Sequence, residues 1–283
     1  MYYFSLPYFF YIFVAIAFVC GLYFWFKNKS EKAKRRLLLA LMIFNFLQHI
    51  LKSFIYPHLW GEGFTGLNTA YNMCAFLILS TPFIYLFGSE LWKNFIVYLG
   101  TASGAVAILV PYWFTVDTAF TWEAIRFYLC HILLILTSIL PLLFGIYKIN
   151  WRKCWRLPFL FFLALIIIVF NEIICFVTGL FDGGSDLFAY LKSVNPCWTF
   201  GPFESFEWVG DFIAPFTPDV FLPSVAGDYV PILWFALPLY FVIAGGALAF
   251  GAFLDKKRFK SDIASLKEKA IMIKDKFHRG DRK

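Results

Sequence analysis

The chain has 283 residues, of which 61% are hydrophobic and only 15% are charged. Soluble domains are nearer half apolar and a quarter charged, so this composition excludes an ordinary soluble domain and indicates a protein that spans a membrane. The net charge of +7 alone would suit a nucleic-acid partner. The basic residues are instead arranged as in a membrane protein, and we expect no nucleic-acid partner.

Seven apolar segments are long enough to cross a bilayer as helices, which takes about 20 residues each. They are Tyr8–Phe26, Leu37–Tyr56, Asn68–Phe87, Phe95–Phe114, Trp122–Tyr147, Leu157–Leu180 and Tyr229–Leu254. Strands of a membrane barrel would alternate polar and apolar residues over about 10 positions, which these runs do not. The predicted fold class is therefore all-α, a polytopic membrane protein built as a bundle of seven transmembrane helices.

Lysine and arginine residues follow every second segment. Six lie in residues 27–36, one is Lys93, four lie in residues 148–156 and eleven in residues 256–283, which makes 22 of the 25. Basic loops stay on the cytoplasmic side of a membrane. We therefore expect the N-terminus outside and the C-terminus in the cytoplasm, in a multi-pass protein of the bacterial plasma membrane.

The chain divides into a transmembrane domain over residues 1–255 and a basic amphipathic cytoplasmic tail over residues 256–283. The long outer loop at residues 181–228 is too rich in aromatic residues for disorder. It is either a lid over the outer mouth of the bundle or an ordinary folded cap. The tail is either a solvated basic helix or a helix that lies on the anionic inner leaflet.

The six cysteines form no C-x-x-C pair and have no zinc-ribbon spacing. We therefore expect neither a disulfide framework nor a structural metal site, and no cofactor.

The second segment carries a stripe of polar residues. Asn45, Gln48, His49 and Lys52 have spacings of three, four and seven from the first, which places them on one face of a helix. Such a face contacts protein or water rather than lipid. The stripe is either a set of hydrogen bonds between helices or one wall of a site.

The fifth segment contains an acid, a base and a histidine, which are expensive in hydrocarbon and therefore face the bundle interior. Glu123 and Arg126 are three residues apart and would form a structural ion pair. His131 lies deeper in the same segment. At 1.5 Å per residue, four polar groups lie roughly 9–16 Å inside the outer ends of their helices. We expect them to converge around His131; they are His49, Cys74, His131 and Glu172.

Three chemical interpretations fit these groups. Cys74 is a nucleophile and His131 its base, with Asn72 or Asn171 stabilising an oxyanion. Alternatively, His49, His131 and Glu172 hold a zinc ion that activates water. The non-enzymatic alternative is a carrier or binder of a small molecule or ion that depends on Lys52, His49 and Glu172.

The sequence Tyr71-Asn72-Met73-Cys74, the Cys130-His131 step and Asn171 together resemble the YwaF-type integral membrane protein family, which is related to transmembrane protein 164. In that family an intramembrane cysteine and histidine are proposed to transfer phospholipid acyl chains. The resemblance implies that Cys74 is the nucleophile and His131 the base of a phospholipid acyltransferase. The partners would be membrane lipids, with a lipid or another small molecule as substrate.

Overall fold

A computed structural model describes residues 4–55, 63–111, 114–180, 185–203 and 206–280, and these ranges contain helices and no strand. Five of the described helical stretches are long and apolar enough to cross a membrane by length and composition. They are α1 (Leu6–Phe26), α2 (Glu31–Ile55), α7 (Trp122–Leu143), the joined η3 and α8 (Trp151–Val177) and α12 (Leu233–Leu254). The all-helical membrane architecture is thereby confirmed.

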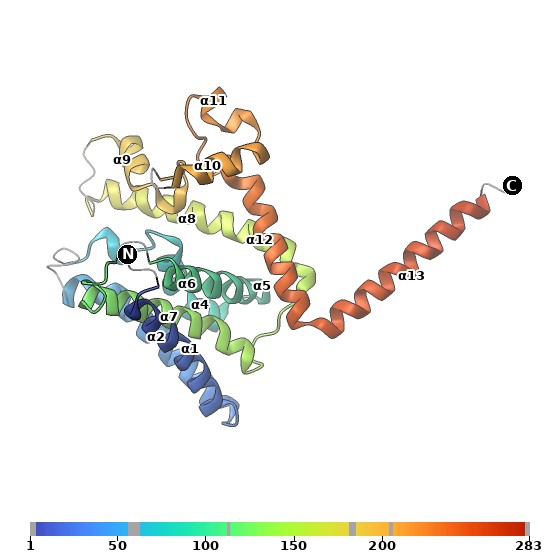
Figure 1. Ribbon diagram of the computed structural model, residues 1–283, viewed down its shortest axis with the longest axis horizontal. Coiled ribbons are helices and arrows are strands. Elements are labelled where there is room, and N and C mark those ends of the chain that lie inside the picture. The colour runs from blue at the N-terminus through green and yellow to red at the C-terminus, as the bar shows by residue number, and fades with distance from the viewer. Residues whose placement is uncertain (1–3, 56–62, 112–113, 181–184, 204–205, 281–283) are drawn as a thin grey trace.

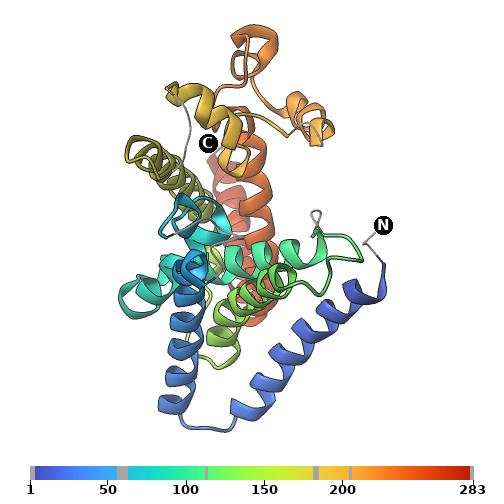
Figure 2. The same ribbon diagram turned by 90° about the vertical axis from the view of Figure 1, so that its left-hand side faces the viewer.

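Helix α7 is the centre of the bundle. It packs against α1, α2, α4 (Met73–Phe87) and α6 (Thr101–Leu109), as Figures 1 and 2 show. Thr121 caps its N-terminus by accepting a hydrogen bond from the Ala124 N–H. Because neighbouring helices cover α7 on several sides, most polar residues along it are buried in protein rather than exposed to lipid. They are Arg126, His131, Thr137 and Ser138.

Helix α4 begins five residues later than the predicted start at Asn68. The side chain of Asn68 donates to the Ile50 carbonyl at 2.7 Å, and Asn72 caps the helix by accepting from the Ala75 N–H at 2.9 Å. Side chains that bond the backbone in this way compete with helix formation. Residues before Met73 therefore form the 3₁₀ turn η1 (Gly66–Asn68) and an extended segment inside the bundle.

The helical stretch that corresponds to the fourth predicted segment, Phe95–Phe114, begins and ends about one turn earlier in the chain than predicted. The helical stretch consists of α5 (Glu90–Phe95), the π-helical turn η2 (Ile96–Gly100) and α6, which ends at Leu109. The helix stops there because Val110 precedes Pro111, and a residue before proline is driven out of the helical conformation.

The remaining segments differ from the prediction at their ends. Helix α7 ends before Gly145 and α8 (Leu157–Val177) before Gly179, and both glycines have positive φ, the usual conformation just past a helix. Helix α12 begins at Leu233 rather than Tyr229, because Pro231 and the left-handed Ile232 interrupt the chain. The predicted end of the second segment, Tyr56, lies outside the described residues.

Residues 185–203 and 206–232 form a set of short helices and turns that we name the cap, seen beside α8 in Figures 1 and 2. Its short helices and turns are α9 (Leu187–Val194), η4 (Pro196–Trp198), α10 (Glu207–Ile213), η6 (Ala214–Phe216), η7 (Asp219–Phe221) and α11 (Pro223–Ala226). The long loop predicted at residues 181–228 is thus largely folded.

The basic connections meet at the other end of the bundle. Lys153 in η3 (Trp151–Arg156) pairs with Glu90 at 2.6 Å, and Lys34 lies 5.5 Å from the ring of Phe144. These contacts place three of the predicted basic loops at one end. Helix α13 (Lys256–Gly280) extends from this end away from the bundle (Figure 1), and its first turns are fastened by an ion pair between Arg152 and Asp262.

Candidate functional site

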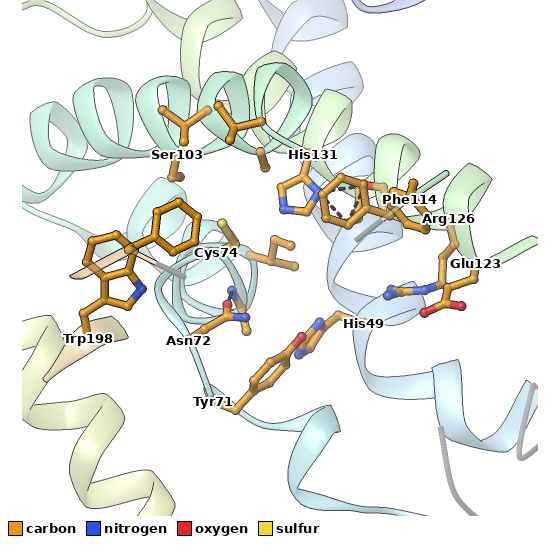
Figure 3. A pocket seen from close by; sticks show the side chains of 18 residues that line it. His49, Tyr71, Asn72, Cys74, Ser103, Phe114, Glu123, Arg126, His131 and Trp198 are labelled. Atoms are coloured by element: carbon orange, nitrogen blue, oxygen red, sulfur yellow. Dashed lines mark hydrogen bonds between the residues drawn. The ribbon is translucent and has the colours of Figure 1, made fainter. Parts of the chain in front are cut away.

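A cavity of about 620 Å³ opens between four helices and the cap. A volume in this range is typical of small-molecule sites. Its wall combines polar groups with a larger apolar surface, and Figure 3 shows the side chains that line it. They are His49, Tyr71, Asn72, Cys74, Ala75, Ile78, Ser103, Val106, Ala107, Val110, Phe114, Glu123, Arg126, Phe127, Cys130, His131, Trp198 and Phe206.

Cys74 lies in the first turn of α4, directly after the capping residue Asn72 and the helix's first residue, Met73. The first backbone N–H groups of a helix have no acceptor within the helix, and its N-terminus carries a partial positive charge. The late start of α4 therefore places the sulfur and a helix N-terminus together at the cavity wall. A helix beginning at Asn68 would have buried both within a turn of regular helix.

His131 is held in one tautomer by its own helix. Its Nδ1 atom lies 2.7 Å from the Phe127 carbonyl oxygen, to which it donates its proton. The lone pair is then on Nε2, because a neutral imidazole carries only one N–H. The Phe127 ring packs 4.3 Å from the His131 ring and fixes its orientation. In Figure 3, His131 faces the same space as the Cys74 sulfur.

Cys130 is a second thiol beside the same histidine. Its sulfur lies 3.4 Å from His131 Nδ1 and 3.1 Å from the Phe127 carbonyl oxygen. It is therefore on the side of the ring that carries the proton rather than the lone pair. Because Nδ1 already carries a proton, His131 is less able to take the proton of the Cys130 thiol than that of a thiol on its Nε2 side.

The polar stripe on α2 has two roles. Asn45 donates to the Cys130 carbonyl oxygen at 3.1 Å, and Gln48 donates to Asn45 at 2.6 Å, so this pair joins α2 to α7. His49 lines the cavity, with its Nε2 atom 3.1 Å from the Thr69 carbonyl oxygen. Lys52 is buried outside the wall, 5.0 Å from the ring of Tyr71.

Asn171 and Glu172 on α8 do not line the cavity. Asn171 donates to the Thr69 hydroxyl at 2.8 Å, while Glu172 accepts from the Tyr190 hydroxyl in the cap at 2.8 Å. Glu172 therefore fastens the cap to the bundle instead of converging on His131. The structure accordingly does not assemble His49, His131 and Glu172 into a set of metal ligands, and the described ranges contain no cluster of three ligand-type side chains.

Glu123 and Arg126 both lie in the cavity wall, and Figure 3 shows them at the same end of it as His49. Arg126 is buried to 8% exposure. The predicted ion pair between the two residues stays a prediction.

Sequence reasoning missed two groups of wall residues. One is Ser103 on α6, whose buried hydroxyl has no hydrogen-bond partner among the described residues. The other is the pair Trp198 and Phe206 from the cap. The motif Gly100-x-x-x-Gly104 could have pointed to the first group, because small residues four apart allow two helices to approach closely.

The sequence model of the TMEM164 family matches residues 3–191, about two thirds of the chain. The chain belongs to the TMEM164 family. Comparisons with curated proteins and with solved structures gave no match. Membership of the TMEM164 family supports a multi-pass membrane protein, while the narrower YwaF-type name stays a prediction. Cys74, His131 and Ser103 lie inside the TMEM164 match, and Trp198 and Phe206 lie beyond it.

Proposed function

We propose that this protein is a membrane enzyme that transfers or hydrolyses lipid acyl groups, with Cys74 as nucleophile and His131 as base. The observation that carries the proposal is that both residues line one largely apolar cavity in which His131 has a fixed tautomer. An amphipathic cavity of this kind suits a lipid ester, whose carbonyl is polar and whose chain is not.

The reaction begins when His131 Nε2 takes the proton of the Cys74 thiol. The thiolate attacks the ester carbonyl carbon and forms a carbon–sulfur bond, and the carbonyl electrons move onto oxygen. Collapse of this intermediate breaks the ester carbon–oxygen bond. The leaving alkoxide takes the proton from His131, which yields a lysolipid and an acyl thioester on Cys74. A lipid hydroxyl or water then accepts the acyl group by the reverse sequence.

The oxyanion formed in each step needs hydrogen-bond donors. Asn72 uses its carbonyl oxygen to cap α4, so its amide nitrogen, which also contacts the Tyr71 side chain, is the part of the side chain that would donate to the oxyanion. The Ser103 hydroxyl and the backbone N–H of Cys74 are further donors at the same cavity, whereas the N–H groups of Ala75 and Phe76 already bond Asn72. Donors that are fixed before the reaction stabilise such an oxyanion without reorganisation.

The membrane arrangement that goes with this activity has seven crossings. The two beyond the five long helices are α4, which starts inside the bundle, and the interrupted helix formed by α5, η2 and α6. The N-terminus and the cap lie outside, and the basic end with α13 lies in the cytoplasm. The cavity then faces the outer leaflet of the plasma membrane of a bacterium, where the partners are membrane lipids.

The test is acyl exchange on phospholipid in vesicles that contain the purified full chain. Cys74→Ala is expected to lower turnover at least about 10³-fold, as removal of a nucleophile does. Cys20→Ala is the matched control, because Cys20 is exposed on α1 far from the cavity wall. Equal turnover in the two variants contradicts the proposal.

A non-enzymatic binder is the second candidate. It is favoured by polar wall residues that the acyl mechanism does not use, namely His49, Glu123 and Arg126. Lys52 and Glu172, which the binder hypothesis also invoked, lie outside the wall. Ligand binding that depends on His49 and Arg126 but survives Cys74→Ala, together with absent turnover, supports this candidate.

A further inference from the structure

The cap contributes an aromatic wall to the cavity. Trp198 and Phe206 line the same space as Cys74, and their ring centroids are 5.3 Å apart. In Figure 3, Trp198 lies at one end of the cavity, the polar residues His49 and Arg126 lie at the other, and Cys74 lies between them. The cavity therefore has one end that carries His49 and Arg126, a reactive centre, and another end that is lined by the aromatic rings of Trp198 and Phe206.

The backbone holds Trp198 in a constrained turn. Asn195, Cys197 and Trp198 have φ values of 39°, 55° and 62°. This left-handed region is unfavourable for residues other than glycine and persists only where surrounding structure imposes it. Here the Asn195 side chain accepts from the Phe200 N–H at 2.9 Å and donates to the Gly201 carbonyl at 2.9 Å.

The main chain of Trp198 is anchored to α12 as well. The indole N–H of Trp234 donates to the Trp198 carbonyl oxygen at 3.0 Å, and Trp234 itself is 1% exposed. These hydrogen bonds hold the turn on both sides, so the backbone of Trp198 has a fixed position. Its position therefore limits what the cavity can hold.

Much of the cavity wall is hydrocarbon. Ile78 of α4, Val106 and Ala107 of α6 and Val110 just after α6 line the cavity without offering a polar side-chain atom. The polar residue that Figure 3 shows on the Trp198 side of Cys74 is Ser103. The volume of about 620 Å³ lies within the range of sites for drug-sized ligands. It suits one acyl chain rather than a whole two-chain lipid.

We propose that Trp198, backed by Phe206, is the stop that sets the length of acyl chain the cavity accepts. The inference rests on the proposed function in that the chain concerned is the one joined to the carbonyl at Cys74. The polar end then receives the glycerol side of the lipid, and the apolar end receives the methyl end of the chain. Trp198 is a specificity-determining residue and takes no part in proton or acyl transfer.

The first experiment measures kcat/KM of the full chain in vesicles for phospholipids that differ only in acyl-chain length. Trp198→Ala is expected to raise the ratio for long over short chains about tenfold or more, because a hydrophobic pocket discriminates by about that much per added group. Trp208→Ala is the matched control, because Trp208 lies in the same cap and is 64% exposed. Trp198→Phe, which keeps a smaller ring, is expected to give an intermediate ratio.

A second measurement does not depend on catalysis. A phospholipid with a diazirine at the methyl end of one chain is photolysed in the presence of the protein, and the labelled peptides are identified. Labelling of residues 195–203 or 206–213 that peaks at one chain length, and shifts to longer chains in Trp198→Ala, supports the proposal. Labelling confined to other helices overturns it, as does an equal loss of turnover for every chain length.

The two proposals fail in different ways. If no acyl group is found on Cys74 but the labelling still depends on chain length and on Trp198, the enzyme proposal fails and the stop remains, in a lipid binder. If Cys74 carries the acyl group and the chain-length ratio is unchanged in Trp198→Ala, the stop is wrong and the enzyme proposal remains.

Discussion

Two regions of the molecule share one cavity and differ in construction. Residues 3–191, which match the TMEM164 family, supply Asn72, Cys74 and His131. The later part of the cap, beyond that match, supplies Trp198 and Phe206. The first region positions its groups by helix packing and regular caps, while the second uses a turn in the left-handed conformation. In the proposed mechanism, the family-matched region carries the reactive groups, and the cap determines the shape of the space around them.

From this difference we expect substitutions in the two regions to have different effects. Changes to the family-matched wall alter the rate for every substrate, whereas changes to the cap wall alter the choice among substrates. Packing between α6 and α7 lies between these extremes, because it supports His131 without touching a substrate.

Among variants that keep Cys74, the largest effect is expected for His131→Ala. Loss of a general base lowers kcat by about 10²- to 10⁴-fold, and the proposed role is that of base and then acid for one proton. Added imidazole is expected to restore part of the turnover, because a small base fills the space left by the side chain. Turnover that is unaffected by the substitution removes His131 from the mechanism.

The next effect separates the two roles of Asn72. Asn72→Asp keeps a side-chain oxygen that caps α4, since aspartate is as good a capping residue as asparagine, but it removes the amide donor. Turnover is expected to fall about 10²- to 10³-fold while thermal unfolding stays near that of the unchanged protein. Full activity in this variant would show that Asn72 only caps the helix.

The sequence predicted much of the wall for one physical reason. Polar residues are conspicuous inside apolar segments, so Cys74, His131 and His49 were identifiable without a structure. Counting residues along each helix gives height in the membrane but not direction around the helix axis. Glu172 therefore accepts a hydrogen bond from Tyr190 in the cap instead of facing the cavity.

Other wall residues gave at most an indirect signal in the sequence. Ser103 looks like an ordinary helical serine, and its exposure to the cavity depends on the close approach of α6 to α7. Trp198 was one of many aromatic residues in a long loop. Its position depends on a left-handed turn that is held by a hydrogen bond from the distant Trp234, which local sequence preferences do not reveal. The start of α4 was missed because the side chain of Asn68 bonds the backbone of α2.

A smaller effect, on stability, is expected for Gly104→Ala. A methyl group there would lie 2.7 Å from Ile135 Cγ1 and 3.0 Å from the His131 carbonyl oxygen. Overpacking of this kind costs about 1–3 kcal/mol, measured as a lower free energy of unfolding in detergent. The matched control is Gly21→Ala on α1, where a methyl group would contact nothing within 4 Å. Equal stability of the two variants would show that α6 and α7 are less closely packed.

The smallest effect is expected in the cap. Lys192 forms an ion pair with Asp228, and this hydrogen bond holds the pKa of Asp228 below its ordinary value. A lowered carboxyl pKa stabilises the fold above the pKa of the unfolded chain, and the contribution is lost as the pH falls through the folded value. Because both side chains are more than a third exposed, Lys192→Ala is expected to cost no more than about 1 kcal/mol at pH 7. A larger loss, or a changed chain-length preference, would show that the ion pair positions the cap.

The most direct test of the division between reactive core and shaping cap is peptide mass spectrometry of the protein after incubation with phospholipid. The account predicts the mass of one acyl group on Cys74, labile to hydroxylamine as thioesters are. It also predicts that the acyl chain found there is longer in Trp198→Ala than in the unchanged protein. An acyl group on Cys130 instead, or none on any cysteine under conditions of measurable acyl exchange, would contradict the account.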